Sequence, residues 1–154
     1  PTAHELQVLA TIEQGVAAYA TRAYIASLPR GYGVKDIGWV GWAPPLENTP
    51  PNPQLAALIP GFQPVFASDD FIVQHRAAEA GVGAIILGRT RSRLALSTPL
   101  VPLKLDLGKR SARLQLVCAR SALSIPRVRA VADLLASELQ AGQASGPGSK
   151  RSSR

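Results

Sequence analysis

The sequence contains no methionine, a single cysteine and few aromatic residues. Cys118 has no partner for a disulfide within the chain, and one cysteine cannot supply a cysteine-based metal cluster. The apolar runs are also short: VGAIILG, at 82–88, is far below the roughly 20 apolar residues that cross a bilayer. Nor does any segment combine a basic start, an apolar stretch and a cleavage site of small residues. The sequence therefore predicts a cytoplasmic protein without membrane spans.

The excess of positive charge is confined to one end of the sequence. Residues 1–108 carry eight basic and eight acidic side chains, so the whole net charge of +7 lies in residues 109–154. Residues 142–154 are rich in Gly and Ser and end in KRSSR, which predicts a disordered basic tail. A basic face interleaved with aromatic residues, or a recognition helix, is missing. Nucleic-acid binding by this chain itself is therefore not predicted.

The 154 residues suffice for one domain or two small lobes, and 46% hydrophobic residues can form a core. Strand-like and helix-like segments alternate along the chain. Extended segments are predicted at 7–20, as one or two segments interrupted at Gly15, and at 36–42, 62–67, 84–87, 100–107 and 112–119. Helices are predicted at 21–29, with Thr21 as the N-cap, at 53–60, from about Asp70 to Gly81, and at 124–140. This alternation is typical of an α/β fold with a largely parallel sheet.

The stretch VFASDDFIVQHRAAEAGVGAIIL, at 65–87, has the pattern of a strand, a helix and a second strand. Ser68 or Asp69 is expected to be the N-cap of the helix that begins at about Asp70. Gly81 stands where a left-handed C-cap is needed, and Gly83 allows the next strand to start close to the helix. Because these glycines follow the helix rather than open it, they are not a dinucleotide-binding motif.

A helix N-terminus in an open α/β sheet offers unpaired N–H groups beyond the carboxyl ends of the strands. Ser68 and the amides of residues 69–71 could donate hydrogen bonds there to a carboxylate or a similar small polar group. Asp69 and Asp70 complement the positive end of the helix, but they also repel an anion unless they point away. A helix cap without any ligand remains an equal alternative.

Other polar residues lack the partners that catalysis or metal binding needs. His4 and His75 have no carboxylate or cysteine at metal-ligand spacing, and Ser27, Ser68 and Ser97 lie in no G-x-S-x-G elbow. No segment brings together an acid, a base and a nucleophile. We therefore expect neither an enzyme nor a resident metal or cofactor.

Three stretches in order resemble the effector-binding domain of LysR-type transcriptional regulators. AAYATRAYIASLP, at 17–29, resembles the strand and helix that open the second lobe, with its alanine-tyrosine pair at Ala23-Tyr24. FQPVFASDDFIVQHRAAEAGVGAIILG, at 62–88, resembles the central strand, helix and turn of that lobe. RLQLVCARSALSIPRVRAVADLLASEL, at 113–139, resembles the return strand and final helix, with Pro-Arg-Val-Arg at 126–129.

The resemblance implies a fold of the periplasmic-binding-protein type, in which two α/β lobes enclose a small effector. Residues 1–16 would be a crossover strand from the first lobe. Residues 17–107 would be the second lobe, with a mostly parallel sheet flanked by helices. Residues 108–141 would be the return strand and C-terminal helix of an incomplete first lobe. Carried over by position, Ser68, Asp69 and Asp70 are the expected ligand contacts, with Thr21 a weaker choice.

The chain also departs from the family pattern. The helix-turn-helix domain, the linker helix and most of the first lobe have no counterpart, and Gly88 replaces a usual proline. The expected function is thus an effector-sensing and dimerising module for a small carboxylate-bearing ligand, with self-association and with DNA contact only through a domain outside this chain. The alternative is a solute-binding protein of the same fold feeding a transporter or sensor, which would have to be exported.

Overall fold

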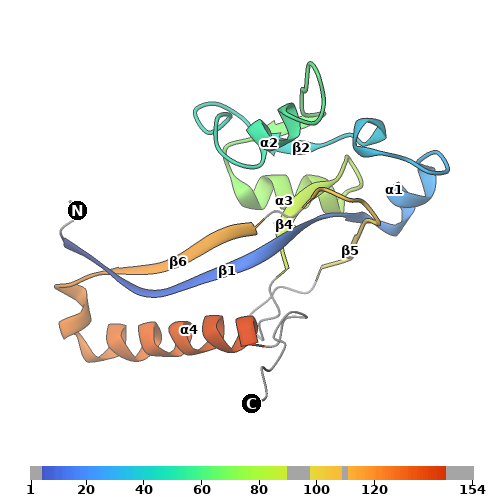
Figure 1. Ribbon diagram of the computed structural model, residues 1–154. Helices are drawn as coiled ribbons and strands as arrows, with labels where there is room; N and C mark the ends of the chain where they lie inside the picture. The colour runs from blue at the N-terminus through green and yellow to red at the C-terminus, as the bar shows by residue number, and fades with distance from the viewer. Residues whose placement is uncertain (1–4, 90–97, 109–110, 145–154) are drawn as a thin grey trace, which may run out of the picture. The chain divides into compact units, whose positions relative to one another are not determined.

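The computed structural model describes residues 5–89, 98–108 and 111–144 (Figure 1). The chain divides into two compact units. The first unit comprises Pro1–Gly15, Gly88–Leu96 and Ser111–Arg154, and the second comprises Val16–Leu87 and Ser97–Arg110. Strand β1 (Leu6–Thr21) belongs to both units, because its residues up to Gly15 lie in the first and the remainder in the second.

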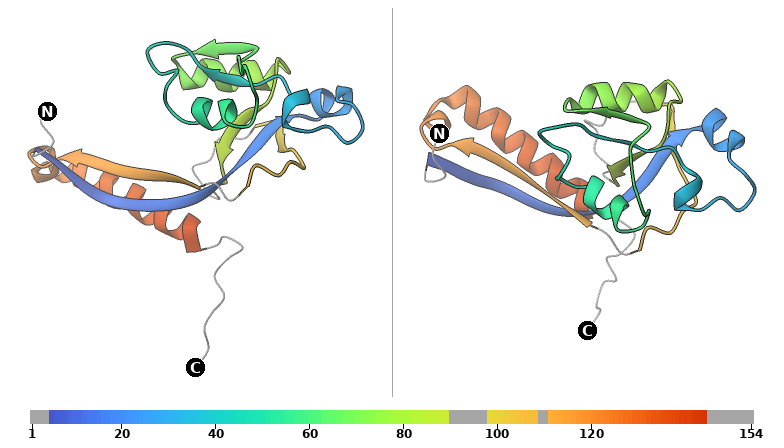
Figure 2. Two further views of the ribbon diagram at one scale, coloured as in Figure 1. Left: turned by 45° about the horizontal axis from the view of Figure 1, so that its top comes forward. Right: turned by 90° about the horizontal axis from the view of Figure 1, so that it is seen from above.

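The first unit consists of a two-stranded antiparallel ribbon and a long helix. The first part of β1 pairs with β6 (Ser111–Ala119), from Leu6 opposite Ala119 to Gly15 opposite Ser111. A short turn of 3-10 helix, η3 (Ala122–Ser124), leads into α4 (Pro126–Ala144). Pro126 suits the first turn, where its missing N–H has no helical acceptor to lose. Figure 2 shows α4 running along the ribbon, where Ala132 is buried.

The second unit holds the larger core. The rest of β1 lies between β4 (Ile85–Gly88) and β5 (Leu100–Pro102), and β5 is antiparallel to it. Strands β2 (Val40–Trp42) and β3 (Phe66–Ser68) form a parallel pair, which a parallel bridge between Trp39 and Ala84 extends. Four short helical segments complete the unit: α1 (Arg22–Ser27), η2 (Val34–Asp36), α2 (Asn52–Ala56) and α3 (Phe71–Glu79).

Two clusters of buried side chains hold this second unit together. Trp39 and Leu55 are almost fully buried in the larger cluster, together with small residues of β1 such as Ala20. In the smaller cluster, Val40 and Ile85 pack beside Ala77 and Ala78 of α3. The full membership is Ala18, Ala20, Ile37, Trp39, Leu55, Ala84, Leu103 and Leu107 in the larger cluster, and Val40, Ala77, Ala78, Ile85 and Leu100 in the smaller. Helix α3 is therefore fixed through its alanines.

The prediction of a largely parallel sheet was wrong. The longest ladder, β1 with β6, is antiparallel, and so is β1 with β5. Within the described ranges, the parallel pairs are β2 with β3 and the bridge between Trp39 and Ala84. The reason is that β1 runs through Gly15 without the interruption that was expected there, so segments from late in the chain return along it in the opposite direction. The architecture is mixed α/β.

Two segment boundaries also differ from the prediction. The expected strand at 100–107 ends at Pro102, and Leu103 and Leu107 reach the core without ladder pairing. The first three residues of the expected tail at 142–154 belong to α4, which continues to Ala144; residues 145–154 lie outside the described residues. Within the described part of the chain, no helix is long and apolar enough to span a membrane.

Candidate functional site

The candidate site lies where β3 ends and α3 begins. Asp70 is the N-cap of α3, since its Oδ1 accepts hydrogen bonds from the amides of Ile72 at 2.7 Å and Val73 at 3.3 Å. The Ser68 hydroxyl oxygen in turn accepts the Asp70 amide at 3.1 Å. The prediction of Ser68 or Asp69 as the cap was therefore wrong by one or two residues. Asp70 has the extended backbone that an N-cap needs.

Buried polar contacts fix the position of Ser68. Its carbonyl oxygen accepts hydrogen bonds from the Gln74 side-chain amide at 2.7 Å and from the Ala43 backbone amide at 3.1 Å. Gln74 is only 3% exposed although it is polar. Ser68 also lies directly opposite Trp42 in the parallel pair, so it stands at the carboxyl ends of both β2 and β3. Sequence reasoning missed Gln74, because a single amide inside a helix carries no distinctive pattern.

The other end of α3 confirms the expected glycine cap. Gly81 has a φ of 81°, its amide bonds the Ala78 carbonyl, and the Val82 amide bonds the Ala77 carbonyl. This is the double hydrogen bond of a Schellman motif. Gly83 is needed for close packing: a Cβ there would lie 2.5 Å from the Gly38 carbonyl oxygen, so the close neighbour is the segment before β2.

Thr21 does not join the other expected contact residues. Its hydroxyl oxygen caps α1 by accepting the Tyr24 amide at 3.2 Å, which confirms the expected cap of that helix. The same oxygen lies 3.6 Å from where a Cβ on Gly81 would stand. Thr21 is thus beside the C-terminal end of α3, whereas Ser68, Asp69 and Asp70 are at its N-terminal end. Nine helical residues, about 13 Å of rise, separate the two ends.

The N-terminal end of α3, with Ser68, Asp69 and Asp70, is called here the mouth of α3, and it combines polar, acidic and apolar side chains. Two of its amides, those of Ile72 and Val73, are already bonded to the Asp70 side chain, which is the usual way in which a helix satisfies its first N–H groups. Asp69 is exposed. Phe71 and Ile72 are 46% and 55% exposed, so apolar surface adjoins the two carboxylates. A small molecule at this position would meet a hydroxyl, acidic groups and apolar side chains.

A hollow of about 420 Å³ lies close to the same strand ends. Trp42, Phe62 and Ala67 line it, together with Pro44 after β2, Pro53 of α2 and Pro64 before β3. Asn52 shapes its wall: the side chain of this buried residue donates to the Trp42 carbonyl at 2.9 Å and accepts the Trp42 amide at 3.1 Å. Nothing in the sequence of residues 43–53 indicated a hollow.

Glu79 and its neighbours form a polar cluster on the last turn of α3. Its carboxylate accepts the Thr98 hydroxyl at 2.9 Å and pairs with Arg76 at 2.6 Å, and the His75 Nδ1 atom lies 3.6 Å away. The hydrogen bond from Thr98 is the main reason that the pKa of Glu79 lies below its ordinary value; Arg76 adds to the effect and desolvation opposes it. His75 also packs against the Phe71 ring.

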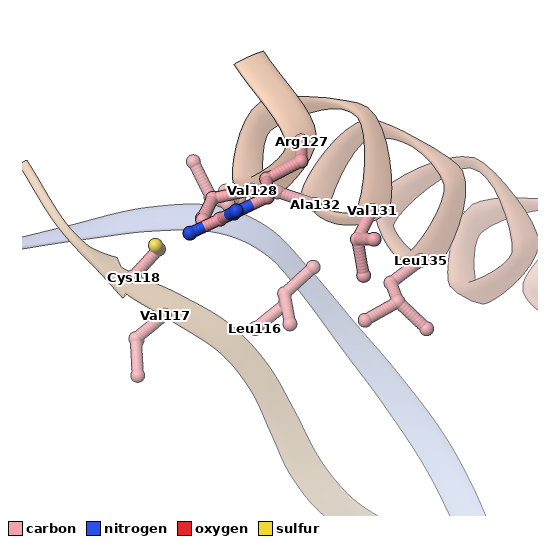
Figure 3. Close-up of a pocket in the computed structure, with 9 residues that line it drawn as sticks. Leu116, Val117, Cys118, Arg127, Val128, Val131, Ala132 and Leu135 are labelled. Carbon is pink, nitrogen blue, oxygen red and sulfur yellow. The ribbon is translucent and has the colours of Figure 1, made fainter. Parts of the chain in front are cut away.

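The first unit carries a separate apolar groove of about 420 Å³ between α4 and the ribbon (Figure 3). Its lining comprises Leu9, Leu116, Val117, Cys118, Arg127, Val128, Val131, Ala132 and Leu135. Figure 3 shows the Arg127 guanidinium extending over the rim toward Cys118. Cys118 is free and partly exposed in this groove. Among the described residues, no group of three or more His, Cys, Asp or Glu could hold a metal ion.

No protein-family profile and no curated protein matches the chain. Solved structures do match. The regulatory domain of CrgA, a LysR-type transcriptional regulator from Neisseria meningitidis, has a TM-score of 0.59 at 14% identity, over 90% of this chain and 72% of that one. The effector-binding domain of QuiR in complex with shikimate has a TM-score of 0.52 at 14% identity, over 94% and 68%.

A third match is the Synechocystis PCC6803 CcmR regulatory domain in complex with 2-PG. Its TM-score is 0.55 at 12% identity, and the match covers 91% of this chain and 70% of that one. At such identities the likeness concerns the fold alone. Over about nine-tenths of its length, this chain has a mixed α/β fold that matches the regulatory and effector-binding domains of LysR-type regulators.

Proposed function

We propose that this chain is the effector-sensing module of a LysR-type transcriptional regulator and that it works in the cytoplasm. The observation that carries the proposal is the fold, which matches three regulatory domains of that kind, two of them in complex with a small molecule. Contact with DNA would be made by a helix-turn-helix domain outside this chain. The module would bind and sense, without catalysis and without a cofactor.

We place the ligand at the mouth of α3, beside Ser68, Asp69 and Asp70. Ser68 stands at the carboxyl ends of two parallel strands, where open α/β sheets bind ligands. Its hydroxyl oxygen accepts from Asp70, and its O–H group can therefore donate to a ligand. The positive end of α3 favours a negative group, which makes a small carboxylate the expected ligand class. Thr21 lies at the C-terminal end of α3 and would not contact a ligand bound beside Ser68.

The two acids set the selectivity of this site. Asp70 already satisfies two amides of α3, so an incoming carboxylate competes with it for the same donors. The ligand must therefore gain from other contacts, and the exposed side chains of Phe71 and Ile72 supply apolar surface. A carboxylate attached to a ring or an alkyl chain fits this combination better than a small inorganic anion.

Sensing would operate through a shift of conformational populations. A ligand can change the balance of two states only by as much as its affinities for them differ. In this proposal the ligand favours one conformation of the complete regulator, and that conformation determines how the DNA-binding domains of the regulator are positioned. We also propose that the module self-associates, because the apolar side chains on the outside of the first unit are only partly covered.

The experiment is a thermal-shift screen of the 154-residue chain against small carboxylates, with shikimate and benzoate as first probes. A ligand at one hundred times its Kd adds about 2.7 kcal/mol to the free energy of unfolding, which raises Tm by several degrees. Ser68→Trp should remove the shift, because the indole fills the site. Ser121→Trp is the control, which places the same indole on an exposed serine of the first unit whose hydroxyl caps no helix.

The proposal fails if no carboxylate raises Tm, or if Ser68→Trp and Ser121→Trp respond alike to one that does. Location of the protein outside the cytoplasmic membrane would instead support the solute-binding alternative.

A further inference from the structure

The hollow close to the end of β2 contains a single charged side chain. Between Asp36 and Asp69, the only acidic or basic residue of the sequence is Glu47. Glu47 lines the hollow, together with the aromatic side chains of Trp42 and Phe62. The other lining residues are neutral. The hollow therefore combines one carboxylate with aromatic and apolar walls.

The N–H groups of the lining side chains already make hydrogen bonds within the chain. The Trp42 indole N–H donates to the Pro50 carbonyl at 2.9 Å, and the Asn52 side-chain amide donates to the Trp42 carbonyl at 2.9 Å. The Asn48 side-chain amide donates to Oε1 of Glu47 at 3.3 Å. An anion in the hollow would have to compete for these donors, and it would also be repelled by the Glu47 carboxylate.

The Glu47 carboxylate is not used by an ion pair of the fold. It takes part in none of the salt bridges formed among the described residues. It is exposed and lies between β2 and α2, outside any helix whose N-terminal end an acid could stabilise. Its charge therefore remains available to a positively charged group that enters the hollow.

Backbone hydrogen bonds hold the segment that carries Glu47 in place. The amides of Leu46, Thr49 and Asn52 each bond the carbonyl three residues earlier, at 2.9, 2.9 and 3.2 Å. The segment thus follows a series of consecutive turns between β2 and α2. A site whose walls are already fixed loses less conformational entropy when a ligand binds.

We propose that this hollow binds an organic ammonium ion with an aromatic or alkyl body. Trp42 and Phe62 supply aromatic rings, which attract a cation that lies within about 6 Å of the ring centre. Glu47 supplies the opposite charge. The volume of about 420 Å³ is within the range of roughly 300–1,000 Å³ that is typical of small-molecule sites. The proposed cation site is independent of the carboxylate site at the mouth of α3, and the two differ in the charge of their ligands.

A cation suits the hollow better than a neutral apolar molecule does. A neutral molecule would contact the same apolar walls, but it would displace water from the Glu47 carboxylate without replacing the lost hydrogen bonds. An ammonium group supplies both N–H donors and the complementary charge. The charge of the ligand is therefore the property that the experiment has to vary.

The test is an NMR titration of the 15N-labelled 154-residue chain with 2-phenylethylamine, which is an ammonium ion at neutral pH. The chain has two tryptophans and so two indole N–H signals, which Trp42→Phe assigns. The Trp42 signal should shift in a saturable manner. The Trp39 signal should not, because Trp39 is 2% exposed and its indole N–H donates to the Val34 carbonyl. The neutral analogue 2-phenylethanol should bind at least about tenfold more weakly.

Glu47→Gln should weaken the binding of 2-phenylethylamine at least about tenfold, because it removes the charge and keeps the shape. The matched control is Glu13→Gln, the same substitution at an exposed residue of the first unit, which should leave the affinity unchanged. The proposal is overturned if 2-phenylethylamine causes no saturable shift of the Trp42 signal. It is equally overturned if the amine and the alcohol bind alike, or if Glu47→Gln and Glu13→Gln have the same effect.

Discussion

The Gln74 side-chain amide donates a hydrogen bond of 2.7 Å to the carbonyl oxygen of Ser68. This contact joins the body of α3 to the end of β3 and is shielded from water, since Gln74 is 3% exposed. A buried polar side chain of this kind fixes geometry, because any other arrangement leaves its donors unpaired. Gln74 is therefore the positioning residue of the candidate site, although it makes no contact expected of a ligand-binding residue.

Gln74→Ala should destabilise the chain by about 2–3 kcal/mol, since it removes the hydrogen bond and leaves a small cavity. Urea denaturation followed by circular dichroism measures the change. Gln63→Ala is the control, because Gln63 is exposed, and it should cost less than about 0.5 kcal/mol. An equal effect of the two substitutions would show that the buried amide does not hold α3 in place.

Two substitutions of Asp70 should separate its role as a helix cap from the effect of its negative charge on ligand binding. Asn caps a helix as well as Asp, so Asp70→Asn should change the free energy of unfolding little, whereas Asp70→Ala should cost about 1 kcal/mol. Because Asp70→Asn also removes a negative charge from the site, it should bind a carboxylate probe more tightly than the unchanged chain does. Isothermal titration compares the two affinities. Weaker carboxylate binding by Asp70→Asn would mean that the ligand does not approach this helix end.

Gly83→Ala should disturb the close contact between the backbone at Gly83 and the backbone at Gly38. The added Cβ would stand 2.5 Å from the Gly38 carbonyl oxygen, a backbone atom that cannot rotate aside. We expect a loss of about 1–3 kcal/mol, with the fluorescence of the neighbouring buried Trp39 altered. Gly33→Ala is the matched control: a Cβ there meets only the Asp36 carboxylate, at 3.8 Å. A Gly83→Ala chain as stable as the control would contradict the close packing.

Glu79 should make stability depend on acid pH. Its pKa is lowered in the folded chain from the ordinary value of 4.5, chiefly by the hydrogen bond from Thr98. A carboxyl group with a lowered folded pKa stabilises the fold above its unfolded pKa, and the contribution disappears as pH falls through the folded value. Glu79→Gln and Thr98→Val should both flatten the decline of Tm below pH 4.5. If Tm declines below pH 4.5 as steeply in both variants as in the unchanged chain, the hydrogen bond between Glu79 and Thr98 does not contribute to the pH dependence of stability.

Local signals in the sequence predicted local structure well. Thr21 as the cap of α1 and Gly81 as the left-handed cap of α3 are confirmed, because each depends on a few adjacent residues. The cap of α3 was wrong by one or two residues, since Ser68, Asp69 and Asp70 are all good capping residues and only the backbone path decides among them. Residue type alone cannot rank three consecutive caps.

Long-range relationships were predicted less well, for a physical reason. The alternation of strands and helices does not encode which strands pair, and β1 turned out to pair antiparallel with β5 and β6. Likewise, Thr21 and Ser68 are each the last residue of a strand, yet they lie at opposite ends of α3. The contacts of Gln74 and Asn52 arise only from tertiary packing. The ligand role of Ser68, Asp69, Asp70 and Thr21 stays a prediction.

The most direct test of the proposed function is a titration of the 15N-labelled chain with shikimate and benzoate, followed by backbone-amide NMR. A carboxylate at the mouth of α3 should perturb the amides of residues 68–73 in a saturable manner, and Ser68→Trp should abolish the effect. Saturable perturbation of other residues alone, or none with any small carboxylate, would contradict the proposed site.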